Sequence, residues 1–90
     1  MPTITVPSLM KYYLNDLTEV TVSGKTVSQA LHDLTSRFPA VKMHILDSQG
    51  NLRRHVNLFV NQDNIKDLEG LETPILETDK IILMPSISGG

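Results

Sequence analysis

The chain has 90 residues, of which 40% are hydrophobic and 20% charged, and its formal net charge at pH 7 is −2. This composition is ordinary for one globular domain with its own core, and we expect that domain to span residues 1–85. A net negative charge without a basic stripe argues against nucleic-acid binding. No apolar run approaches the roughly 18 residues of a membrane-spanning helix. The first residues show no signal-peptide pattern, so we expect a cytoplasmic location.

The residue types that usually build metal and catalytic sites are scarce or scattered. The sequence has no cysteine, which excludes disulfides, thiolate metal sites and a cysteine nucleophile. The three histidines, His32, His44 and His55, do not share the ligand spacing of a short metal motif, so we predict no metal site. Residues 63–79 hold one base, Lys66, and six acids: Asp63, Asp67, Glu69, Glu72, Glu77 and Asp79. Paired carboxylates can act as acid and base, but here we interpret the acids as a solvated edge.

The first part of the chain predicts two strands joined by an irregular connection. Residues 3–6 alternate apolar side chains with threonine, which is typical of a half-buried strand, and Pro7 ends it. Residues 8–17 show no clear period and contain a turn-forming Asn-Asp pair. Residues 19–22 predict the second strand.

The clearest helix follows. Thr26 and Gln29 have the spacing of a capping box, in which both side chains satisfy free backbone donors. An apolar stripe follows at helical spacing: Val27, Ala30, Leu31, Leu34 and Phe38. Because Pro39 disfavours helix at the preceding residue, we expect the helix to end near Phe38. Residues 41–45 predict one or two further helical turns.

The second half of the chain predicts strands at residues 53–60 and 81–84, with a short return strand near Ile65. Val56, Leu58 and Val60 should share one face. A single amphipathic helix can cover only one face of the sheet. The fold class is therefore α+β, with a mixed four- to five-stranded sheet and one main helix packed on one face.

The open face of this sheet is predicted to carry a docking surface. If Ile81 and Leu83 face the helix, then Ile82 and Met84 point the other way, together with Phe59. An apolar patch on an uncovered sheet often marks a partner site. The alternative is that residues 8–17 fold over this face and cover it.

The end of the sequence has a different character from the rest. After Pro85 the side chains are small or polar, and the sequence ends in Gly89 and Gly90. Five extended residues reach about 17 Å, and glycine allows close approach in a narrow channel because it has no Cβ. We therefore interpret residues 86–90 as a flexible tail that presents the α-carboxylate of Gly90 to another protein. The alternative is an ordinary frayed terminus.

The pattern Asp79, Ile81, Pro85, Gly89, Gly90 resembles the carboxy terminus of the ThiS/MoaD-type sulfur carrier proteins, which are relatives of ubiquitin. Residues 56–61, Val-Asn-Leu-Phe-Val-Asn, are similar to the central strand of that family. The resemblance implies a ubiquitin-like β-grasp, whose first and last strands pair in parallel at the centre.

The resemblance also implies a function. The chain would be a carrier and substrate of other enzymes, with no catalytic residues and no bound cofactor of its own. An E1-like adenylyltransferase/sulfurtransferase would use ATP and magnesium to adenylate Gly90, which is then converted to a thiocarboxylate. Gly89 would serve passage into that partner's active site.

The receiver of the sulfur is a finer question. Residues 52–61 and 82–90 look more similar to the carriers of cysteine synthesis, whose partner is a PLP-dependent synthase. Pro85 is followed by Ser86, whereas molybdopterin carriers often have paired prolines there. The alternatives are the small subunit of molybdopterin synthase, which works with the large subunit, and a thiamine carrier. Two further alternatives are a ubiquitin-like modifier joined to lysines and a plain interaction module.

Overall fold

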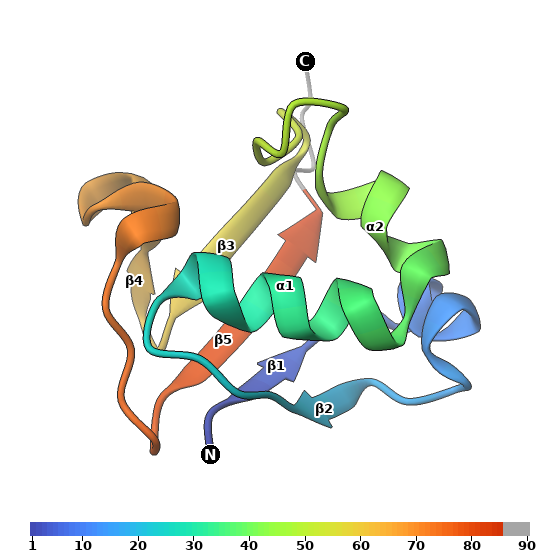
Figure 1. Ribbon diagram of the computed structural model, residues 1–90, viewed down its shortest axis with the longest axis horizontal. Helices are drawn as coiled ribbons and strands as arrows, with labels where there is room; N and C mark the ends of the chain where they lie inside the picture. The colour runs from blue at the N-terminus through green and yellow to red at the C-terminus, as the bar shows by residue number, and fades with distance from the viewer. Residues whose placement is uncertain (86–90) are drawn as a thin grey trace.

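A computed structural model describes residues 1–85 of the chain. It contains a five-stranded sheet in the order β2-β1-β5-β3-β4, with α1 lying across one face and α2 continuing beside it (Figure 1). The strands are β1 (Thr3–Thr5), β2 (Glu19–Thr21), β3 (Val56–Val60), β4 (Asp63–Asn64) and β5 (Lys80–Pro85). The helices are α1 (Val27–Arg37) and α2 (Pro39–Ile45), with short 3-10 helices η1 (Ser8–Leu14), η2 (Ile65–Asp67) and η3 (Gly70–Glu72).

Strand β5 forms the middle of the sheet. It pairs in parallel with β1, where Ile4 lies opposite Ile81, and antiparallel with β3, where Leu58 lies opposite Leu83. The first and last strands therefore pair in parallel at the centre. The predicted α+β class, the mixed sheet and the single main helix on one face are all confirmed.

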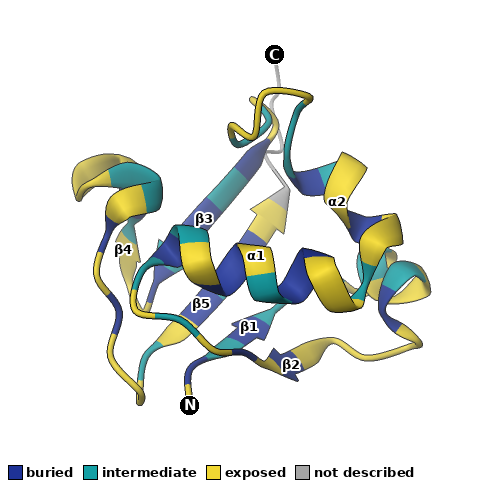
Figure 2. Ribbon diagram, viewed as in Figure 1, coloured by how far each residue is buried: buried dark blue, intermediate teal, exposed yellow. Residues whose placement is uncertain are grey.

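The core lies between α1 and the face of the sheet beneath it (Figure 2). From the helix come Leu31 and Leu34, and from the sheet come Ile4, Leu58 and Ile81, all at most 2% exposed. The predicted apolar stripe is confirmed up to Leu34, whereas Phe38 is only partly buried against the core. The helix ends at Arg37 and the next begins at Pro39, because proline excludes helix in the residue before it but suits a first helical position.

The start of α1 differs in one detail from the predicted capping box. The hydroxyl of Thr26 accepts a hydrogen bond from the Gln29 N–H at 3.2 Å, as expected. The Gln29 side chain, however, accepts from the N–H of Lys25 at 2.9 Å rather than from Thr26. Gly24 lies against this same turn, and a Cβ there would be 2.8 Å from the Ala30 nitrogen. The turn before α1 is thus packed directly on the backbone of the helix.

Three predicted boundaries need correction. Residues 8–17 contain η1, which buries only Leu14 and so shows no helical period in the sequence. The third strand begins at Val56 instead of residue 53, because the Arg53 side chain donates to the Met43 carbonyl at 2.6 Å and holds that segment to α2. The return strand is Asp63–Asn64, and Ile65 already belongs to η2.

Among residues 1–85, no helix is long and apolar enough to cross a membrane.

Candidate functional site

Strand β5 determines where the C-terminal segment leaves the domain. Its last residue, Pro85, lies opposite Val56, the first residue of β3. Between β1 and β3, the strand has neighbours on both sides, so its direction and register are fixed. It runs away from residue 1 and towards the end of the molecule where α2 and the loop before β3 lie (Figure 1). The predicted tail at residues 86–90, including Gly89 and Gly90, lies outside the described part of the chain.

A polar clamp at the other end of β5 holds this register. Asn61, whose φ is +57°, follows β3 directly. Its side-chain oxygen accepts from the Lys80 N–H, and its side-chain nitrogen donates to Asp79, both at 3.1 Å. Asp79 also accepts from the Leu76 N–H at 2.8 Å. The clamp ties the start of β5 to the end of β3, so it positions the strand that leads to Gly90.

Sequence reasoning assigned Asp79 to a solvated acidic edge, and this was wrong for that residue. Asp79 is partly buried and bonded as above, whereas the other five acids of residues 63–79 are exposed. The sequence did contain a sign of this role: Asn61 and Asp79 both stand at predicted turns, where Asn and Asp side chains commonly bond to nearby backbone groups.

The three predicted docking residues project from the sheet face opposite α1. Phe59 and Ile82 are cross-strand partners and half-buried, and Met84, opposite Asn57, is 49% exposed. Ile81 and Leu83, which alternate with them, are buried at 0% and 2% exposure. The face also carries the half-buried Thr5, which pairs with Ile82. The structure thus brings the three residues onto two adjacent strands near the point where the chain leaves the sheet.

Helix η1 lies on the other side of the sheet. It packs against α2, and it shares a recess with Val56 and Leu83, both of which face the core. The segment that the sequence left as a possible cover for the open face is therefore part of the helical layer.

The three histidines differ in burial and in their contacts. His44 is half-buried and stacked on Tyr13 with ring centroids 4.2 Å apart, whereas His32 and His55 are exposed. In the part of the chain that the structure describes, no three His, Cys, Asp or Glu residues form a group that could hold a metal ion.

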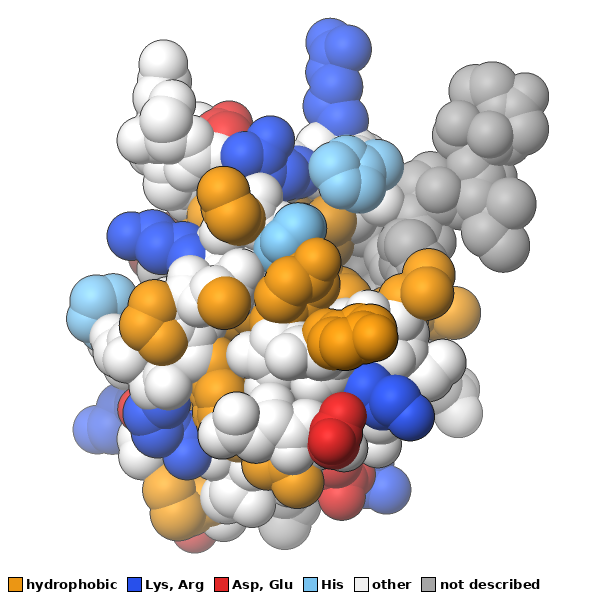
Figure 3. All heavy atoms as spheres, turned by 90° about the vertical axis from the view of Figure 1, so that its right-hand side faces the viewer, with side chains coloured by type: hydrophobic (Ala, Val, Ile, Leu, Met, Phe, Trp, Pro, Cys, Tyr) orange, Lys and Arg blue, Asp and Glu red, His pale blue; other side chains and the backbone are white. Residues whose placement is uncertain are grey.

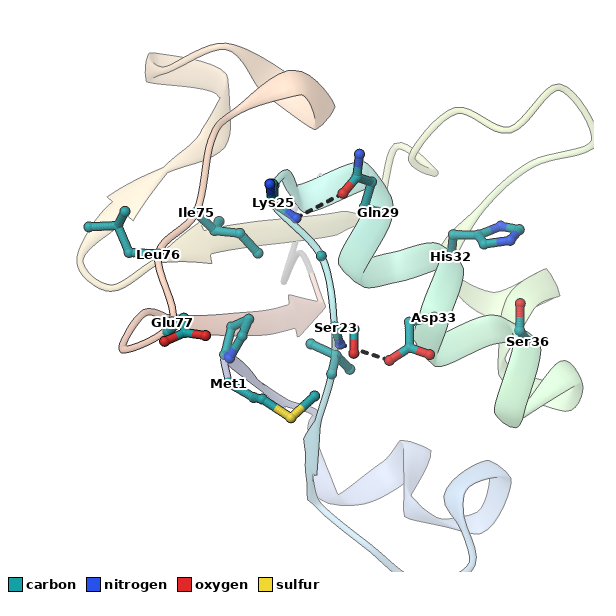
Figure 4. Close-up of a pocket in the computed structure, with 13 residues that line it drawn as sticks. Met1, Ser23, Lys25, Gln29, His32, Asp33, Ser36, Ile75, Leu76 and Glu77 are labelled. Atoms are coloured by element: carbon teal, nitrogen blue, oxygen red, sulfur yellow. Dashed lines mark hydrogen bonds between the residues drawn. The ribbon is translucent and has the colours of Figure 1, made fainter.

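A recess of about 1070 Å³ lies between the first two residues, the loop before α1, α1 itself and residues 75–77 (Figure 4). Its polar side chains stabilise the loop before α1: Asp33 accepts from the Ser23 N–H at 2.8 Å, and Gln29 accepts from Lys25. Asp33 also pairs with Arg37 at 3.2 Å. We therefore assign these groups a structural role.

A mixed sheet with parallel first and last strands, crossed by one main helix, is the β-grasp fold of ubiquitin-like proteins. Here its central strand leads into a segment that contains Gly89 and Gly90, which places the chain among the small ubiquitin-like proteins. Residues 9–90 match the ThiS family. The chain belongs to this family of sulfur carrier proteins, whose members are carriers rather than catalysts.

Individual proteins are similar over almost the whole chain. The sulfur carrier protein CysO of Mycobacterium tuberculosis is 28% identical over 90 residues, which cover 98% of this chain and 97% of CysO. Its crystal structure superposes with a TM-score of 0.90 at 26% identity, covering 97% of this chain and all of CysO.

Two further structures share the fold. CysO from a BexX/CysO complex of Amycolatopsis orientalis gives a TM-score of 0.91 at 24% identity, with full coverage of both chains. Small archaeal modifier protein 1 (SAMP1) of Methanosarcina acetivorans gives 0.84 at 30% identity, covering 99% of this chain and 95% of SAMP1.

Proposed function

We propose that the α-carboxylate of Gly90 carries the sulfur, as a thiocarboxylate formed in two steps on an E1-like enzyme. A carboxylate oxygen first attacks the α-phosphate of ATP, so that acyl-adenylate forms and pyrophosphate leaves. Sulfide or an enzyme-bound persulfide then attacks the acyl carbon, and AMP leaves. Attack by a persulfide gives an acyl disulfide, and a thiol must reduce its S–S bond to release the thiocarboxylate. ATP and magnesium belong to the partner. The observation that carries this proposal is the ThiS-family match, which extends through Gly90.

The open face of the sheet is our proposed docking surface for this activating enzyme. Phe59, Ile82 and Met84 offer apolar area on β3 and β5, next to the strand end from which Gly90 must reach the active site. Gly89 would let the segment pass through a narrow channel, since it has no side chain.

For the receiver of the sulfur we propose cysteine synthesis. Support comes from the similarity to CysO, which is named a sulfur carrier protein, over 98% of the chain, and from the resemblance in residues 52–61 and 82–90. A PLP-dependent synthase would turn activated serine into an aminoacrylate, and the thiocarboxylate sulfur would add to its β-carbon. An S-to-N acyl shift then leaves cysteine in amide linkage to Gly90, and a peptidase hydrolyses that bond.

The first test is the mass of the protein isolated from its native host. Exchange of oxygen for sulfur changes the intact mass by nearly as much as one oxidation, so fragment ions must place the change on Gly90. A pool whose Gly90 is always an unmodified carboxylate, even under sulfur demand, would contradict the proposal.

The second test separates the pathways. The thiocarboxylated protein is mixed either with a cysteine synthase and activated serine, or with the large subunit of molybdopterin synthase and its pterin substrate. We expect a cysteinyl adduct on Gly90 in the first mixture. Turnover in the second mixture alone would make the chain a molybdopterin carrier.

Extension of the chain tests the role of Gly90 directly. One alanine added after Gly90 should abolish adenylation, measured as ATP–pyrophosphate exchange, because the reacting carboxylate is displaced by a residue. The melting temperature should not change. The same alanine added before Met1 is the matched control and should leave exchange intact. Normal exchange by the untrimmed extended protein would refute Gly90 as the acyl site.

A second candidate function is protein modification. It is favoured by the similarity to SAMP1, whose name describes a modifier. A lysine amine would then attack the acyl carbon of the same adenylated Gly90, so that an isopeptide forms and AMP leaves. Mass spectrometry of conjugates from host cells would detect glycine-linked lysines in target proteins, and their absence would leave only the carrier role.

A further inference from the structure

A second recess lies between η1 and α2, on the helical side of the sheet. Its volume is about 350 Å³, which falls within the range of pockets that bind small groups. Val56 and Leu83 are buried at its floor, and Met10, Tyr13 and His44 form its walls. The stacked rings of Tyr13 and His44 hold η1 against α2. The recess is therefore part of the fixed packing of the two elements.

The rim of this recess is apolar and exposed. Leu9 lines it and is 81% exposed, and Tyr12, also on η1, is 87% exposed. Hydrophobic side chains gather on this face of the molecule below two histidines (Figure 3). An exposed apolar surface around a recess is typical of a protein interaction site.

The recess lies beside the strand end from which residues 86–90 leave the sheet. Val56 forms part of its floor and is also the cross-strand partner of Pro85, after which the chain leaves the sheet. The recess is therefore within reach of an enzyme that binds residues 86–90, while the length of those residues lets another enzyme bind them from the open face. The open face with Met84 lies on the other side of the same strand end.

Charge distinguishes this end of the molecule from the opposite one. Residues 7–17 and 39–55 hold four bases, Lys11, Lys42, Arg53 and Arg54, and two acids, Asp16 and Asp47. Lysine and arginine side chains lie above the apolar cluster in Figure 3. Residues 63–80, in contrast, hold six acids and two lysines. The recess itself is lined by apolar and histidine side chains, so the bases belong to the surface around it. A partner that covers the recess and this surrounding surface should present carboxylates at its edge.

We propose that the η1–α2 recess is a second docking surface, which binds the enzyme that accepts the sulfur through an apolar side chain flanked by carboxylates. This rests on the proposed carrier function. The activating and the accepting enzymes receive the same five residues, so those residues cannot tell the two enzymes apart. Two folded surfaces on opposite sides of the strand end give each enzyme its own contact.

The test measures binding of the purified chain to a PLP-dependent cysteine synthase, and separately its ATP–pyrophosphate exchange with an E1-like activating enzyme. The variants are Leu9→Asp and Arg54→Glu, both at exposed positions, so the fold should be kept. Each should raise the Kd for the synthase about tenfold, since a charge is placed against an apolar or an acidic contact. Exchange should stay within about twofold of the unchanged protein, because the change lies away from the open face.

The matched control is Leu68→Asp, which changes an exposed leucine at 44% exposure outside this surface. It should alter neither measurement. Unchanged synthase binding by both variants would overturn the second surface, and so would no binding by the unaltered chain. An equal loss of exchange would assign the recess to the activating enzyme and overturn the proposal as well. If the unaltered chain binds the synthase but is never adenylated, the carrier function fails while the surface stands.

Discussion

The two faces of β5 differ in how far their side chains are buried. Towards α1 the strand presents Ile81 and Leu83, which are at most 2% exposed. Away from α1 it presents Ile82, which is half-buried, and Met84, which is 49% exposed. All four side chains are apolar, so the sequence of the strand alone does not distinguish them.

Under the proposed docking role of the open face, one strand serves two purposes. The buried face contributes to the stability of the domain through transfer of apolar surface from water. The open face contributes less to stability, so its side chains are less constrained by packing and are free to suit a binding partner. Substitutions on the two faces should therefore affect different measurements, and this division can be tested from the core outwards.

The largest effect on stability is expected under α1. Leu34→Ala should lower the free energy of unfolding by roughly 2–5 kcal/mol, as for other large-to-small changes in a packed core, because Leu34 is 0% exposed. Denaturant unfolding measures the change. Leu76→Ala is the control, since Leu76 is 70% exposed and should change stability by less than about 0.5 kcal/mol. Equal effects at the two positions would contradict the assigned core.

The next effect concerns the turn that packs on α1. Gly24→Ala should cost roughly 3 kcal/mol, since the new Cβ meets backbone that cannot move away and φ is unfavourable. Gly50→Ala separates these causes: Gly50 has a φ of +83°, but a Cβ added there would have no other atom within 4 Å. It should cost only about 1 kcal/mol. A loss at Gly24 no greater than at Gly50 would show that the close approach is unimportant.

A smaller effect is expected on the open face, and in binding instead of stability. Met84→Asp should raise the Kd for the activating enzyme about tenfold, or about 1.4 kcal/mol, and leave the melting temperature unchanged. Met43→Asp is the matched control, because Met43 lies on α2 and is 65% exposed. If Met84→Asp unfolds the domain, or if both variants bind equally well, the two faces of β5 do not divide their roles as described.

The smallest effect belongs to the cap of α1. Thr26→Ala should lower the free energy of unfolding by about 1 kcal/mol through loss of the hydrogen bond to Gln29. Thr26→Ser keeps the hydroxyl and should recover most of that stability. If the alanine and serine variants have the same unfolding curve, the Thr26 hydroxyl does not stabilise α1.

Much of the fold could be predicted because local patterns and tertiary packing agree. The stripe from Val27 to Leu34 is both a helical pattern and the buried face of α1. In β3 the alternation of Val56, Leu58 and Val60 is likewise reproduced in the burial. Pro39 predicted the end of α1, because proline disfavours helix in the residue before it. It is also the first residue of α2, a role that depends on the residues that follow it.

The rest depended on contacts between distant residues. The start of β3 was misplaced because Arg53 bonds to Met43, ten residues away. The role of Asp79 was missed because its partner Asn61 lies eighteen residues earlier. The recess beside η1 gave no periodic signal, since it forms only when Tyr13 meets His44. The candidate docking residues could be named from alternation alone, but their position beside the strand end required the register of β3 and β5.

The parallel pairing of β1 and β5 also has a mechanical consequence. A force that pulls residue 1 and the end of β5 apart acts along both strands, and these point the same way. The hydrogen bonds between the strands are then loaded together in shear, whereas a hairpin pulled at its open end loses its bonds one at a time. The domain should consequently resist unfolding by a machine that pulls on its C-terminal segment.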